Sequence, residues 1–148
     1  MKLTARSFFS PEQKEDLKLA IQNAELDTSG EVRIHLETSC KGEANDRAVQ
    51  IFKTLGMDKT ELRNGVLFYL AVKNRKFAVI GDSGINRMVD ENFWEHLKAL
   101  LIENFAEGKF TEGLILGVSN VGEELKKYFP HKPDDTNELP DELSFGDE

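Results

Sequence analysis

The sequence predicts an α/β protein, a three-layer α/β/α sandwich around a small mixed β-sheet. Three observations predict this class. Helix and strand patterns follow the order α-β-α-β-β-α-α along the chain. One helix pattern separates the first two strand patterns, as in a βαβ unit, so these strands should be parallel with a right-handed crossover. The second and third strand patterns are separated only by residues 73–75, so they should pair as an antiparallel hairpin.

Ser10 should begin the first helix, which should end near Asp27. Ser10 supplies a capping hydroxyl, Pro11 suits the first helical position, and Gln13 completes a capping box. Residues 31–38 then alternate between apolar and polar side chains, which predicts a half-buried strand. The apolar face of this strand carries Val32, Ile34 and Leu36, and its polar face carries Arg33, His35 and Glu37.

The middle of the chain supplies one more helix and two more strands. Residues 44–55 should form a helix that Gly56 closes in a left-handed conformation. Residues 65–72 are apolar throughout, which predicts a central strand covered on both faces. Residues 76–80 form a further apolar strand, which completes the hairpin.

Two helices end the pattern. Asp90 can cap the first, which ends at Gly108, and Thr111 can cap the second, which Pro130 stops. The second helix contains glycines, which lower helix propensity. We expect close packing on a neighbouring element to explain them, at Gly113, Gly117 and Gly122.

Length and composition are those of a single globular domain. The chain has 148 residues and a mass of 16.8 kDa, with 39% hydrophobic and 31% charged residues. A chain of this size can bury a core without metal or disulfide support. It has no apolar run near the ~20 residues of a membrane helix, and no signal-peptide pattern follows Met1. The single cysteine, Cys40, excludes an internal disulfide framework and a multi-cysteine zinc site. We therefore expect a cytoplasmic monomer without a membrane partner.

Residues 131–148 form an acidic tail. The net charge of the chain is −8, and this segment contributes seven acidic residues and one lysine, which leaves the expected domain, residues 1–130, near neutral. The tail's polar, Pro-containing composition favours disorder. The alternative is that Leu139, Leu143 and Phe145 dock on the domain. Because the domain carries no basic stripe in its sequence, we expect no nucleic-acid partner.

One rim of the predicted sheet gathers carboxylate and amide side chains. The second strand begins where the third ends, and the first strand is parallel to the second, so these three strand ends share a rim. Carboxylate and carbonyl oxygens suit a hard cation such as Ca²⁺ or Mg²⁺. The simpler alternatives are that Asp90 is a helix cap and Asp82 a turn residue. The predicted ligands are Asn64, Asp82, Asp90 and Glu91, with Glu31 as a further candidate.

The opposite rim gives a second candidate group. Parallel strands usually place ligands beyond their carboxyl ends. The segment that follows the first strand carries Glu37, Glu43 and Asp46, which could also bind a divalent cation.

Four segments of the chain resemble the TPM domain family, namely residues 28–33, 64–67, 80–85 and 110–114. Their spacing agrees along roughly residues 8–130, and residues 135–145 resemble the ending of a soluble bacterial branch. The resemblance implies an α/β/α sandwich, divalent-cation binding, Ca²⁺ especially, and a phosphatase label inherited from a thylakoid acid phosphatase.

The family's motif positions match Asn64, Gly65, Gly81 and Gly84. Many members have an aspartate before the Asn-Gly pair, where this chain has Arg63. This difference removes one acid from the first rim.

Three functions remain open from the sequence. The first is a divalent-cation-binding module with no strong catalysis. The second is a metal-assisted phosphatase, in which a cation would polarise the phosphoryl oxygens and activate a bound water, and Arg63 would hold the substrate phosphate. The third is a protein-interaction adaptor that uses the acidic tail or the exposed face of the first strand.

Overall fold

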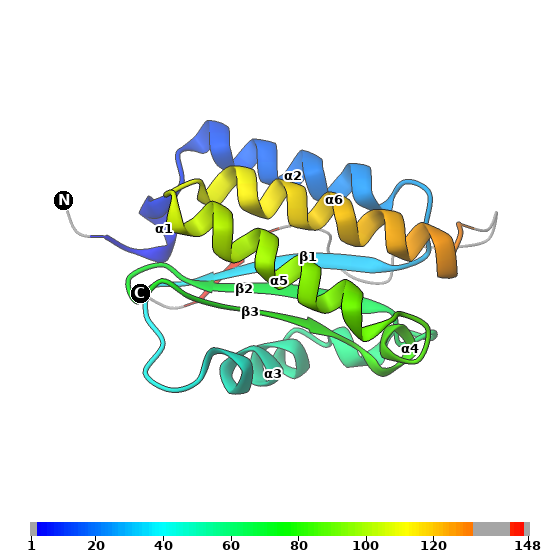
Figure 1. Ribbon diagram of the computed structural model, residues 1–148. Helices are drawn as coiled ribbons and strands as arrows, with labels where there is room; N and C mark the ends of the chain where they lie inside the picture. The colour runs from blue at the N-terminus through cyan, green and yellow to red at the C-terminus, as the bar shows by residue number, and fades with distance from the viewer. Residues whose placement is uncertain (1–2, 132–142, 147–148) are drawn as a thin grey trace.

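The computed structural model describes residues 3–131 and 143–146, which build a four-stranded sheet in the order β3-β2-β1-β4 (Figure 1). β1 is parallel to both β2 and β4, whereas β2 and β3 form the antiparallel hairpin that the sequence predicts. The strands are β1 (Glu31–Glu37), β2 (Gly65–Ala71), β3 (Lys76–Gly81) and β4 (Leu143–Phe145).

Helices cover both faces of the sheet, which confirms the three-layer prediction (Figure 1). On one face α2, α5 and α6 pack over the larger apolar core, and on the other α3 and η1 pack over a smaller one. The helices are α1 (Ala5–Phe8), α2 (Pro11–Glu25), α3 (Ala44–Thr54), the 3₁₀ helix η1 (Met57–Lys59), α4 (Ser83–Asn86), α5 (Glu91–Ala106) and α6 (Phe110–Tyr128).

Local sequence signals place most element boundaries correctly. Ser10 and Gln13 form the predicted capping box of α2, and Asp90 caps α5 by accepting a hydrogen bond from the Asn92 N–H. Gly56 adopts the predicted left-handed conformation after α3, with φ of 74°. The glycines of α6 do allow close packing, since a Cβ added to Gly122 would lie 2.8 Å from the Cβ of Ala24.

Two expectations about the elements are wrong. Thr111 does not cap α6, because the helix already begins at Phe110, and Lys109 occupies the cap position without a side-chain hydrogen bond. β1 is not half-buried, because all seven of its residues are buried. Helix α3 covers the face that carries His35 and Glu37, so the polar side of this strand lies inside the protein.

The segment 143–146 docks on the sheet. Leu143 pairs with Ile34 and Phe145 with Leu36, in a parallel register. The docking alternative is therefore confirmed for Leu143 and Phe145, whereas Leu139 lies outside the described residues.

Membrane crossing has no support from the described helices, since none combines the length and the apolar character that a span requires.

Candidate functional site

The first rim forms as the topology predicts. The Glu31 N–H donates to the Asn64 carbonyl over 3.3 Å, and the Asp82 N–H donates to the Gly65 carbonyl over 3.0 Å. These bonds bring together the start of β1, the start of β2 and the end of β3. Glu31, Asn64 and Asp82 are all buried there.

The side chains of this rim are largely engaged with each other. The Asp82 carboxylate accepts from the Ser83 N–H over 2.7 Å and from Arg63 Nε over 2.9 Å. The Asn64 amide donates to Ser29 Oγ over 3.4 Å. The hydrogen bond from Arg63 to Asp82 raises the pKa of the guanidinium. Arg63, predicted to hold a phosphate, thus already has an anionic partner.

The other two residues of the first candidate group begin α5. Asp90 is the exposed N-cap of the helix, and its carboxylate accepts from the Asn92 N–H over 3.2 Å. Glu91 is the exposed first helical residue. Within the described residues, no group of three or more His, Cys, Asp or Glu side chains is arranged to hold a metal ion.

The opposite rim carries a cavity of about 760 Å³ at the carboxyl end of β1. Its walls come from the end of β1, the loop 38–43, one side of α3 along its length, the end of β4 and Gly146. All three acids of the second candidate group, Glu37, Glu43 and Asp46, line this cavity. We call it the carboxyl-end pocket.

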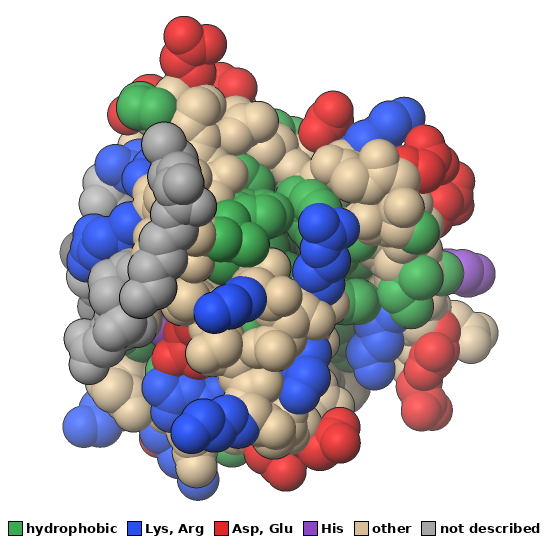
Figure 2. Space-filling view, turned by 90° about the vertical axis from the view of Figure 1, so that its left-hand side faces the viewer, with side chains coloured by type: hydrophobic (Ala, Val, Ile, Leu, Met, Phe, Trp, Pro, Cys, Tyr) green, Lys and Arg blue, Asp and Glu red, His purple; other side chains and the backbone are tan. Residues whose placement is uncertain are grey.

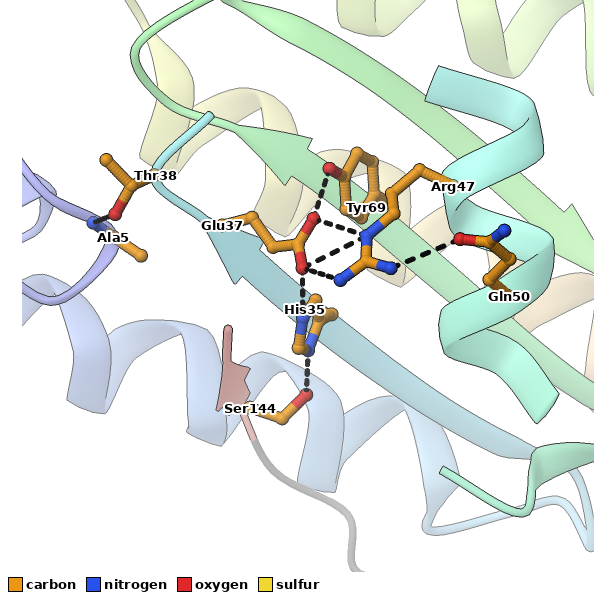
Figure 3. A network of polar contacts seen from close by, with 8 residues as sticks. All are labelled: Ala5, His35, Glu37, Thr38, Arg47, Gln50, Tyr69 and Ser144. Carbon is orange, nitrogen blue, oxygen red and sulfur yellow. Dashed lines mark hydrogen bonds and ion pairs between the residues drawn. The ribbon is translucent and has the colours of Figure 1, made fainter. Parts of the chain in front are cut away.

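On the pocket wall, Glu37 is held by hydrogen bonds from two residues, Arg47 and Tyr69 (Figure 3). Arg47 donates from Nε to Oε1 over 2.9 Å and from Nη2 to Oε2 over 2.6 Å. The Tyr69 hydroxyl donates to Oε1 over 2.6 Å. Burial raises the pKa of Glu37, but the hydrogen bonds from Arg47 and Tyr69 outweigh it and hold the pKa below its usual value. Glu37 is therefore an ionised, fully partnered carboxylate.

His35 lies two residues before Glu37 on the same face of β1. Its Nδ1 lies 2.7 Å from Ser144 Oγ, and its Nε2 lies 3.7 Å from Glu37 Oε2 (Figure 3). Burial lowers the pKa of His35 although Glu37 opposes this effect, so the imidazole is neutral near pH 7. Ser144, His35 and Glu37 follow the order nucleophile, base and acid. However, 3.7 Å is too long for the hydrogen bond that orients a catalytic base, and Glu37 is already committed to Arg47.

The pocket also has a basic side that the sequence did not reveal. Figure 2 faces this end of the molecule and shows Lys and Arg side chains spread across it. Lys41 and Arg47 line the pocket. Lys76 donates to the carbonyls of Cys40 over 3.1 Å and Gly42 over 2.9 Å, and so fastens the loop that forms one wall. These bases come from separate elements, so only the fold brings them together.

Sequence reasoning found the acids of the pocket but missed Arg47, His35, Tyr69 and Ser144. One signal was available, because His35 and Glu37 share the polar side of an alternating strand. Their partners on α3, β2 and β4 are distant in sequence, and no local pattern points to them.

Comparison with known proteins agrees with this fold. The chain is similar to the protein BA42 from the psychrophilic bacterium Bizionia argentinensis, with 42% sequence identity and a TM-score of 0.88 over 95% of this chain and 97% of that one. No curated protein matches the chain.

Two more distant structures share the fold alone. The N-terminal domain of cg2496 from Corynebacterium glutamicum has 10% identity and a TM-score of 0.63 over 92% of this chain and 80% of that one. The N-terminal domain of a P. gingivalis protein has 19% identity and a TM-score of 0.68 over 85% and 83%. The family model of the TPM domain matches residues 4–124. With most of its length matched, the chain belongs to the TPM domain family.

Proposed function

We propose that the chain is a divalent-cation-binding TPM domain whose Ca²⁺ or Mg²⁺ binds in the carboxyl-end pocket. The observation that supports this site is the position of Glu43 and Asp46 on the pocket wall. Both side chains are exposed, and neither forms a salt bridge within the described residues. Glu43 is the N-cap of α3 and Asp46 lies in its first turn, a spacing of three residues that puts the carboxylates on one helix face.

The donor set suits a cation that keeps part of its water shell. Two carboxylates are too few for an all-protein cage, and the Glu37 oxygens are occupied by Arg47 and Tyr69. Mg²⁺ is commonly bound by one or two carboxylates together with waters and ligand oxygens. Glu43 and Asp46 would hold the ion, which when bound supplies charge that can polarise a ligand oxygen.

The first rim is less suitable for a divalent ion. Asp82 is paired with Arg63 and Asp90 caps α5, so their carboxylates would have to break existing bonds before they could bind an ion.

A second candidate function is metal-assisted phosphate ester hydrolysis in the same pocket. Arg47 and Lys41 stand on the wall beside Glu43 and Asp46, so a phosphate could meet cationic side chains and a metal ion together. This arrangement favours Arg47 over Arg63 as the phosphate-binding residue, because Arg47 lines the same pocket as Glu43 and Asp46, whereas Arg63 lies at the first rim beside Asp82.

The test follows backbone amide shifts while CaCl₂ or MgCl₂ is added to ion-free protein at constant ionic strength. Saturable shifts at Glu43, Asp46 and the loop 38–43 are expected, and they should vanish in the E43Q/D46N variant. Saturable shifts confined to Asn64 and Asp82 would move the site to the first rim. No shifts at millimolar ion would refute cation binding and leave the adaptor function. Turnover of p-nitrophenyl phosphate that needs the ion and is lost in R47M would support the second candidate.

A further inference from the structure

At the first rim, the segment before β2 crosses the segment after β3 in direct backbone contact. The Gly84 N–H donates to the Arg63 carbonyl over 2.9 Å. A Cβ at Gly84 would overlap the carbonyl oxygen of Leu62 and lie 2.6 Å from that of Arg63. The two segments are therefore packed too tightly at this point for any side chain at position 84. Side chains that stabilise this crossing of the two segments must therefore lie next to Gly84 and not at it.

Arg63 is placed at this crossing in an unusual backbone conformation. Its φ is 52°, a left-handed value that is uncommon for residues other than glycine, asparagine and aspartate. This conformation accompanies a specific side-chain contact, because Arg63 Nε reaches Asp82 Oδ2 over 2.9 Å. The Asp82 side chain is only 6% exposed, so its charge has little solvent to stabilise it.

A second carboxylate, that of Asp58, lies near Arg63 and Asp82. Asp58, Arg63 and Asp82 line one small cavity of about 190 Å³. Asp58 Oδ1 is shielded from solvent and has no hydrogen-bond partner among the described residues. The carboxylates of Asp82 and Asp58 both raise the pKa of Arg63, the former more strongly. The guanidinium thus pairs directly with Asp82 and feels the charge of Asp58 across the same cavity.

We propose that the Arg63 guanidinium is a resident cation that takes the place of a divalent ion between Asp58 and Asp82. It balances the buried carboxylate of Asp82 and holds the crossing together without any metal. The divalent cation that the family resemblance implies therefore does not fit the first rim of this chain. The Arg63 guanidinium already occupies the place beside Asp82 where such an ion would bind.

The proposal has a consequence for a variant that lacks the guanidinium. R63A would leave two aspartates lining this cavity, one of them a buried carboxylate without its charge partner. Carboxylate and carbonyl oxygens are the ligands of hard divalent cations. The variant should therefore acquire a response to Ca²⁺ or Mg²⁺ that the original chain does not have at this rim.

The experiment measures the thermal midpoint and backbone amide shifts of full-length wild type, R63A and R63K. Each is measured in EDTA and then in millimolar CaCl₂, with NaCl as the ionic-strength control. R63A should melt lower than wild type in EDTA and recover part of the loss in CaCl₂, with saturable shifts at Asp58 and Asp82. R63K keeps the positive charge, so it should show no shifts at Asp58 and Asp82, and CaCl₂ should raise its thermal midpoint no more than that of wild type. Adding D58N and D82N to R63A should abolish the response.

Two results would overturn the proposal. One is a saturable shift at Asp58 and Asp82 in wild type, since the guanidinium would then not exclude the ion. The other is a folded R63A that shows no shifts at Asp58 and Asp82 and gains no more thermal stability from CaCl₂ than wild type does. If R63A does not fold in EDTA, R63Q replaces it, and failure of CaCl₂ to restore or stabilise either variant also refutes the idea. The cation site proposed in the carboxyl-end pocket is judged separately, from shifts at Glu43 and Asp46.

Discussion

Glu37 and Arg47 join the end of β1 to α3 through a two-pronged ion pair. Arg47 Nη2 and Nε reach the two carboxylate oxygens over 2.6 and 2.9 Å. The carboxylate is almost fully buried, whereas 41% of the Arg47 side chain is exposed. The pair therefore has two effects. It neutralises the buried Glu37 carboxylate between β1 and α3, and it places the Arg47 guanidinium at the carboxyl-end pocket.

Removing the arginine should be more damaging than its exposure suggests. R47M should lower the free energy of unfolding by about 2–3 kcal/mol, because Glu37 stays buried and loses its charge partner. This figure is below the range for fully buried pairs, since solvent reaches part of Arg47. Urea denaturation measures it. E37Q/R47M should recover part of the loss, and a cost of only about 0.5 kcal/mol in R47M would mean that the pair acts as an ordinary surface contact.

Acid should destabilise the protein in two separate pH windows. The pKa of His35 is lowered from 6.5 by burial, so below that pH the unfolded chain binds a proton that the folded chain resists, and stability falls. The pKa of Glu37 lies below 4.5, because the hydrogen bonds from Arg47 outweigh burial. Its contribution is complete above that pH and is lost as the pH drops through the folded value.

Two variants separate these windows in chemical denaturation at a series of pH values. H35Q should flatten the decline that begins near pH 6.5 and keep the acidic one, whereas E37Q should do the reverse. An H35Q profile that matches wild type between these two pH values would contradict the assignment to His35.

Gly84 cannot be replaced by a residue with a side chain, because it lies against the backbone of the segment before β2. G84A should cost at least about 3 kcal/mol, because its Cβ would overlap backbone carbonyls that cannot move as freely as a side chain. Gly42 offers a matched control, since a Cβ there meets nothing within 4 Å. G42A should stay within about 0.5 kcal/mol of wild type. Similar thermal midpoints for the two variants would contradict the tight crossing.

Removal of residues 143–148 should weaken the protein and loosen β1. Leu143 is 9% exposed, and Phe145 packs on the main core beneath the cationic groups of Arg6 and Lys14. The loss of these contacts should cost about 2–3 kcal/mol. Hydrogen exchange should speed up in β1. A variant shortened by residues 147–148 alone serves as the control, and equal stability of the two shortened chains would argue against the docking of β4.

The layout of the fold follows from local signals and from connection lengths. Capping residues, the strand patterns and the link at 73–75 together predict the hairpin and the shared rim, and both predictions are confirmed. The burial of the polar face of β1 could not be predicted in this way. It depends on Arg47, which comes from another element and compensates Glu37 only once α3 is in place.

The side-chain partners at the candidate sites also could not be predicted from local sequence patterns. Topology places Asp82 at the first rim, but the left-handed turn at Arg63 directs a guanidinium onto it, which the sequence pattern does not reveal. In the region from 131 onwards, acidic composition favours disorder, yet Leu143 and Phe145 find partners on β1. Composition describes the average of such a segment, whereas docking depends on a few side chains.

The two helical layers are unequal, and this has a kinetic consequence. The face under α2, α5 and α6 holds the larger apolar core. Helix α3 rests on a smaller one, which adjoins the polar contacts of Glu37 through Tyr69. Regions with fewer buried apolar contacts open first in the native state. Transient detachment of α3 from the sheet should therefore be the local opening that costs the least free energy. A ligand bound in the carboxyl-end pocket would slow this opening, because it would contact both α3 and β1.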